Sequence, residues 1–61
     1  MKFRVRYYKM DEDNNHALSE IEVEGESFLD ALQHAHQRID KMILRSNKWV
    51  SSGIIGIYEV E

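Results

Sequence analysis

The sequence contains no cysteine and no proline, and it has only three glycines. Without cysteine, neither disulfide bonds nor thiolate metal sites can form. No apolar run is long enough to span a membrane, and alternating charges follow Met1 where a signal peptide would be apolar. We therefore expect a protein of a reducing, cytoplasmic compartment, without a membrane segment.

Positive charge is also scarce, with 8 Lys and Arg residues against 11 Asp and Glu residues and a net charge of −3. General affinity for nucleic acid requires concentrated positive charge, so we expect no tight binding of nucleic acid at physiological salt. The 61 residues suffice for one domain, residues 1–61, which leaves much of its surface exposed. Such small scaffolds gain stability from metal or association, and we expect a homodimer or larger oligomer.

Two segments alternate between apolar and polar residues, as β-strands with one buried face do. In residues 2–8, KFRVRYY, the apolar face carries Phe3, Val5 and Tyr7, and the other carries Lys2, Arg4, Arg6 and Tyr8. In residues 18–24, LSEIEVE, Ile21 and Val23 oppose Glu20, Glu22 and Glu24. The polar residues 9–17 between them predict a hairpin with a long, mobile loop.

A helix is predicted from about Phe28 to Leu44 or Arg45, with Ser27 as its N-cap. Asp30 places negative charge near the positive end of the helix dipole. Helical spacing gives one apolar stripe, formed by Phe28, Ala31, Leu32, Ala35, Ile39, Met42 and Ile43. A third strand follows from about Trp49, in which Gly53 and Gly56 indicate a bend, a bulge or a close backbone contact.

The order strand, strand, helix, strand predicts an α+β fold, a single ββαβ domain. A right-handed crossover makes the third strand parallel to the second, so its place beside the first gives a three-stranded antiparallel sheet of order 2-1-3. The helix then covers one face. The other face, the open face, carries the basic row formed by Lys2, Arg4 and Arg6 of the first strand. With this strand order the basic row lies between acidic residues of both neighbouring strands, which are Glu20, Glu22 and Glu24 on one side and Glu59 and Glu61 on the other.

The stretch DEDNNHALSEIE, residues 11–22, has the oxygen ligands of a calcium loop at several positions, with Asp11 first and Glu22 twelfth. However, His16 stands where the sharp turn needs glycine, and strands flank the segment where calcium loops have helices. We expect a hairpin connection and no metal site. His34 and His36 point about 200° apart on the helix, so they cannot share an ion. We place His34 on the wet face beside Asp30, and His36, partly buried, at the edge of the stripe.

No nucleophile–base arrangement and no phosphate-binding glycine loop can be assembled, so we expect neither an enzyme nor a cofactor. The basic and aromatic residues of KFRVRYY leave one alternative, an RNA- or DNA-binding module that uses the basic face of the first strand.

The third strand carries more apolar residues than one helix can cover. If Ile54, Tyr58 and Val60 face the helix, Ile55 and Ile57 face outward and join Tyr8 on the open face. The inverted strand would bury Ile55 and Ile57, and a bulge near Gly56 would bury members of both sets. We take the outward arrangement as an association surface.

The whole chain, in its order of elements and in the segments KFRVRYY, EIEVEGESFLDAL and GIIGIYEVE, resembles compact strand-strand-helix-strand proteins common among small phage products. These include host-directed inhibitors and antitoxins. The resemblance implies a stoichiometric inhibitor that acts in the host cytoplasm by occluding a host protein. The residues expected to bind a partner are Tyr8, Glu20, Glu22, Glu24, Ile55 and Ile57.

Overall fold

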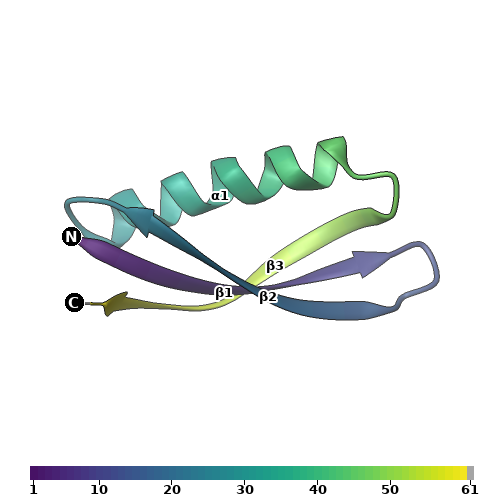
Figure 1. Ribbon diagram of the computed structural model, residues 1–61, viewed down its shortest axis with the longest axis horizontal. Helices are drawn as coiled ribbons and strands as arrows, with labels where there is room; N and C mark the ends of the chain where they lie inside the picture. Colours follow the sequence, from purple (N-terminus) through teal and green to yellow (C-terminus); the bar gives the residue numbers. More distant parts are fainter. Residues whose placement is uncertain (61) are drawn as a thin grey trace.

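The computed structural model describes residues 1–60 and has the predicted architecture (Figure 1). Its elements in chain order are β1 (Lys2–Asp11), β2 (His16–Glu24), α1 (Phe28–Arg45) and β3 (Trp49–Val60). The sheet is antiparallel in the order β2-β1-β3, and α1 lies along one of its faces. The fold class, the strand order and the helix bounds predicted from the sequence are therefore confirmed. Glu61, one of the predicted flanking acids, lies outside the described residues.

The hydrophobic core lies between α1 and the sheet and is small. The sheet contributes four buried side chains and α1 contributes three, which are Phe3, Val5, Tyr7, Val23, Ala31, Ala35 and Ile39. Small residues on the buried face of α1 let the helix approach the sheet closely. One close contact is at Gly25, in the connection between β2 and α1, where a Cβ atom would lie 2.6 Å from the backbone nitrogen of Ala31.

The start of α1 is fixed by side chains that accept hydrogen bonds from backbone amides without a partner in the helix. The Ser27 hydroxyl accepts a hydrogen bond from the Asp30 amide at 3.2 Å, and the Asp30 carboxylate accepts one from the Glu26 amide at 2.9 Å. Asp30 also pairs with His34 at 3.6 Å, as predicted. His36 is exposed, so its predicted partial burial is wrong: the buried stripe runs through Ala31, Ala35 and Ile39 and does not extend to it.

The β1–β2 hairpin has a shorter connection than predicted. Residues 9–11 and 16–17 continue the two strands, and only residues 12–15 form the turn. The Asp11 carboxylate accepts hydrogen bonds from the amides of Asp13 and Asn15, both at 2.9 Å, and from the Asn15 side chain at 3.2 Å. Asn14 adopts a left-handed conformation with φ 64°, which asparagine tolerates better than most residues. Local side-chain hydrogen bonding therefore accounts for Asp11, the first acidic residue of this stretch.

Two bulges interrupt β3. At the first, Arg6 pairs with Gly56 but Tyr7 pairs with Ile54, and at the second, Met10 pairs with Ser51 but Asp11 pairs with Trp49. The extra residues at these shifts are Ile55 and Val50, and they are 58% and 52% exposed. Each bulge changes which residues of β3 face α1, because it inserts one residue into a ladder whose side chains alternate.

The predicted orientation of β3 is consequently right for part of the strand and wrong for the rest. Ile54 packs against the core and Ile55 is exposed, as predicted. Ile57 also packs against the core, so its predicted outward position is wrong. Tyr58 and Val60 pair with Arg4 and Lys2, and therefore lie on the open face and not beneath the helix. The bulge near Gly56 is the reason.

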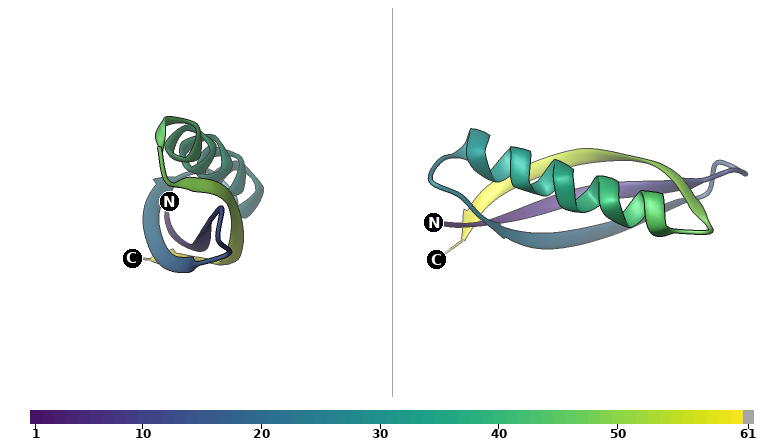
Figure 2. Two further views of the ribbon diagram at one scale, coloured as in Figure 1. Left: turned by 90° about the vertical axis from the view of Figure 1, so that its right-hand side faces the viewer. Right: turned by 90° about the horizontal axis from the view of Figure 1, so that it is seen from above.

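The molecule is elongated, with extents of 36 × 17 × 14 Å. Figure 2 shows that the sheet is strongly twisted and that α1 crosses it on one side only. The opposite face of the sheet, the open face, is left uncovered along its length.

Candidate interaction surface on the open face of the sheet

One half of the open face is charged and internally neutralised. Arg4 lies 3.0 Å from Glu22 and 3.6 Å from Glu20, and Arg6 lies 3.4 Å from Glu20. The hydrogen bond to Glu22, followed by the contact with Tyr58, raises the pKa of the Arg4 guanidinium above its ordinary value. These pairs are exposed and screened by solvent, so they contribute little to stability. Their larger effect is that both arginines already have carboxylate partners.

This charge arrangement agrees with the predicted cross-strand complementarity on the β2 side. On the β3 side it differs, because Glu59 pairs with Phe3 and thus shares the face that α1 covers. Tyr58 and Val60 take the places beside the basic row. The row Lys2, Arg4 and Arg6 therefore has acidic neighbours on one side and apolar or aromatic neighbours on the other.

The other half of the open face is apolar. Tyr8 pairs with Leu18 on β2 and with Gly53 on β3, and Ile55 lies at the neighbouring bulge. We call Tyr8, Leu18 and Ile55 the open-face patch. Leu18 is 68% exposed, Ile55 is 58% exposed, and Tyr8 is half-buried. Side chains from three strands thus form one apolar surface that α1 does not cover.

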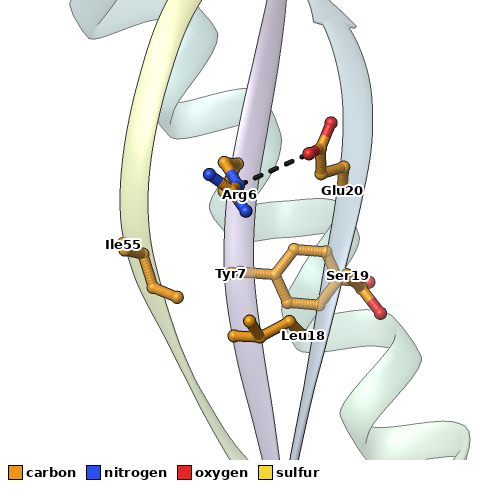
Figure 3. A pocket seen from close by; sticks show the side chains of 6 residues that line it. All are labelled: Arg6, Tyr7, Leu18, Ser19, Glu20 and Ile55. Carbon is orange, nitrogen blue, oxygen red and sulfur yellow. Dashed lines mark ion pairs between the residues drawn. The ribbon is translucent and has the colours of Figure 1, made fainter.

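A shallow pocket lies within this region (Figure 3). Leu18 and Ile55 point toward β1 from the two flanking strands, and the Arg6–Glu20 ion pair borders them. The pocket has a volume of about 220 Å³, and its lining is formed by Arg6, Tyr7, Leu18, Ser19, Glu20 and Ile55. A pocket of this size between exposed aliphatic groups fits an apolar side chain of a partner, with a charged group at its rim.

The position of Tyr8 depends on a glycine. A Cβ atom at Gly53 would lie 2.5–2.6 Å from the Tyr8 ring and hydroxyl, so the ring rests directly on the β3 backbone. The His16 ring flanks it at a centroid distance of 5.7 Å. Tyr8 is thereby held flat on the sheet, and its ring stays accessible as part of the open-face patch.

The structure brings together most of the residues that the sequence predicted for partner binding. Tyr8 and Ile55 lie in the open-face patch, and Glu20, Glu22 and Glu24 run along β2 on the same face. Ile57 does not belong to this surface, because it packs against the core. The prediction missed Leu18. Its alternation signal was nevertheless present in the sequence, since Leu18 has the same parity as Glu20, Glu22 and Glu24.

The outer edges of the sheet differ from the open face in being blunted. The Gly25 amide donates to the Met1 carbonyl, so the backbone groups of Glu22 and Glu24 point away from β1. Side chains of α1 cover them: Arg38 donates to the Glu22 carbonyl, and His34 donates to the Glu24 carbonyl at 2.6 Å. At the other edge, the two bulges bend β3. Both devices discourage another strand from pairing at the edge.

Other possible sites are less complete. Among residues 1–60, no three His, Asp or Glu side chains come close enough together to hold a metal ion. The ammonium groups of Lys9 and Lys48 lie 5.1 and 4.8 Å from the ring centre of Trp49. The ring therefore already makes cation–π contacts within the chain. Leu44 and Val50 are exposed beside a second shallow hollow at the end of α1.

Within residues 1–60, no helix has the length and apolar character needed to cross a membrane. Comparison of the chain with protein-family models, with curated proteins and with solved structures gave no match. The resemblance to small phage-encoded inhibitors and antitoxins, the cytoplasmic location and the absence of enzymatic activity stay predictions.

Proposed function

We propose that the chain is a non-enzymatic protein-binding module whose contact surface is the open-face patch. The observation that supports this most strongly is the exposure of Leu18 and Ile55 on a sheet face that α1 leaves uncovered. Exposed apolar side chains that are grouped and rimmed by charged residues are typical of protein–protein contact sites. Tyr8 adds an aromatic ring, the kind of group that dominates binding energy in such contacts.

The mechanism that we propose is occlusion, as in the stoichiometric inhibitors of phages. A rigid twisted sheet presents a preformed surface, so little conformational entropy is lost when a partner is covered. Glu20 borders the patch along β2, and Glu22 and Glu24 lie beyond it on the same strand. Because Glu20 and Glu22 are already paired with Arg4 and Arg6, a basic group of the partner would have to compete with these arginines for the two carboxylates. The alternative, binding of nucleic acid through Arg4 and Arg6, is disfavoured by their ion pairs with Glu20 and Glu22.

Affinity capture with matched variants tests this function. The immobilised chain is exposed to a lysate of the cells in which it is made, in parallel with Ile55→Asp and Leu44→Asp. Leu44 is 85% exposed at the end of α1, so Leu44→Asp introduces the same charge far from the patch. We expect a protein retained in about equal amount by the wild type and Leu44→Asp, and lost with Ile55→Asp. Equal retention by all three chains would contradict the proposal.

A further inference from the structure

We propose that the open-face patch also binds a second copy of this chain, giving a two-fold dimer in which the strands of the two sheets run antiparallel. This inference rests on the proposed function only in taking the open face as the interaction surface. What it adds is the identity of one partner, a second copy of the chain. We call each row of paired residues across the three strands a level, named after its residue on β1. The twofold axis lies midway between the two packed faces and runs perpendicular to the strands, and it passes between the levels of Arg6 and Tyr8. Ile55 then faces its own copy close to the axis.

The face, and not an edge, is the place for a second copy because both edges are blunted. Arg38 and His34 occupy the outward-facing carbonyls of Glu22 and Glu24 at one end of β2, and two bulges interrupt β3. Edge-to-edge pairing would have to displace these side chains or straighten the bulges. Face-to-face packing of two sheets leaves all of them in place.

Charge selects the antiparallel orientation over the parallel one. An axis along β1 would set Lys2, Arg4 and Arg6 of one copy against the same three residues of the other. Like charges would then face one another along the middle of the interface. An axis across the strands removes this repulsion, because the basic row of each copy then lies over the Tyr8 end of the other. Arg4 and Arg6 keep their carboxylate partners Glu20 and Glu22 when this contact takes them from water, which offsets part of the cost of desolvation.

The register of the sheet specifies which levels meet in the antiparallel arrangement. The level of Arg6 faces the level of Tyr8 in the second copy, which suits a guanidinium over an aromatic ring. The level of Glu22 and Arg4 faces that of His16 and Met10. No two like charges meet at these levels.

One level further out, Lys2 faces the turn that follows β1, where Glu12 is exposed. This is a contact between opposite charges at each end of the interface. It occurs twice in the dimer, because the twofold axis repeats it.

The size of the face allows at most a dimer of modest affinity. The whole molecule has extents of 36 × 17 Å, which set an upper limit of about 600 Å² on each partner, and the twist of the sheet reduces the area that can make contact, so the interface lies at or below the lower end of specific interfaces. The dimer would have four layers, with the two helices outside and the two sheets about 10 Å apart inside. A core of only seven buried side chains per chain gains most from such a second layer.

Cross-linking of single-cysteine variants tests the geometry, and the absence of native cysteine keeps the experiment clean. Purified Ile55→Cys and Leu44→Cys are treated with a short bismaleimide at tens of micromolar, and sedimentation of the untreated variants reports their assembly. We expect both variants to sediment as dimers and only Ile55→Cys to be cross-linked to a covalent dimer. The two Leu44 positions lie on opposite outer sides of the assembly and are too far apart to be bridged.

A charge exchange tests the orientation. Lys2→Glu should weaken the dimer, and Lys2→Glu combined with Glu12→Lys should restore it, each surface pair being worth about 1.5- to 5-fold in affinity. A wild-type monomer at these concentrations, or an Ile55→Cys dimer that the bismaleimide does not cross-link, would overturn the inference. So would failure of the double variant to recover. None of these results touches the capture of a different protein through the same patch, so the two proposals can fail separately.

Discussion

The three glycines differ in what an added methyl group would meet. At Gly25 a Cβ atom would lie 2.6 Å from the backbone nitrogen and 2.9 Å from the Cα of Ala31, and this helical backbone cannot move aside. At Gly53 it would meet the outer atoms of the Tyr8 ring, which can rotate away. At Gly56 there is no heavy atom within 4 Å. We predict that Gly25→Ala destabilises the chain by about 1–3 kcal/mol or more, and Gly53→Ala by less.

Gly56→Ala is the matched control for both substitutions. The three glycines, all within the described residues 1–60, have negative φ angles, so alanine can adopt the backbone conformation at each position. Gly56→Ala should leave stability unchanged or raise it by about 0.4–1 kcal/mol, because alanine reduces the entropy of the unfolded chain. Urea unfolding followed by circular dichroism gives the order. An equal loss at all three positions would show that the helix does not approach Gly25 as described.

At the scale of the elements, the β1–β2 turn depends on one carboxylate. The hydrogen bonds from Asn15, followed by that from the Asp13 amide, lower the pKa of Asp11 below its ordinary value. Because the folded pKa is the lower one, the stabilisation is fully present above the unfolded value of about 3.9 and disappears as pH falls through the folded value.

We therefore predict that the wild type is more stable than Asp11→Asn at pH 6, and that this difference shrinks progressively below about pH 4. Asparagine keeps the shape of the side chain but has no charge to titrate. Urea midpoints measured from pH 6 to about pH 2 provide the comparison, and Asp13→Asn is the control, because it makes the same change at an exposed side chain whose residue bonds Asp11 only through its backbone amide. A constant difference between wild type and Asp11→Asn over this range would show that the turn does not depend on the ionised carboxylate.

The same scale shows how far the sequence determines the fold. Alternation in β1 and β2, the Ser27 cap and the helical stripe are local signals, and each predicted its element. Alternation also predicted the buried faces of β1 and β2, and the stripe predicted the middle of the buried face of α1, whereas Phe28 and Met42 at its ends are 54% and 41% exposed. In β3 the alternation is interrupted at Ile55, so parity predicted the orientation of Ile54 but failed for Ile57 and Tyr58. Gly53 and Gly56 indicated that β3 could contain a bulge, and the bulge beside Gly56 indeed lets both Ile54 and Ile57 pack against the core. Which residue is left unpaired depends on the register with β1, and the sequence of β3 alone does not give that register.

The candidate surface was predictable to a similar extent. Tyr8 and the glutamates follow from alternation within single strands. The grouping of Tyr8 with Leu18 and Ile55 depends on the register between three strands and on the position of the bulge. The sequence could indicate a surplus of apolar residues, but not which of them would be left exposed.

At the scale of the whole molecule, exposed surface is large for the mass. The accessible area is 4466 Å², compared with about 4100 Å² for a typical monomer of 7.2 kDa. An elongated shape and an uncovered sheet face both increase the accessible area, which agrees with the higher value. A protein of this kind has few buried contacts with which to resist unfolding, so association should contribute visibly to its stability.

If the chain folds as the proposed dimer, its thermal midpoint depends on protein concentration, because unfolding also separates the two copies. For two chains of 61 residues, a tenfold increase in concentration should raise the midpoint by about 5 °C. Ile55→Asp should abolish this dependence by placing two carboxylates near the twofold axis, whereas Leu44→Asp should keep it. Calorimetry from about 10 to about 500 μM, which brackets micromolar affinity, measures the effect. A wild-type midpoint that is constant over this range would mean that each copy folds alone, and that the open face is reserved for a different protein.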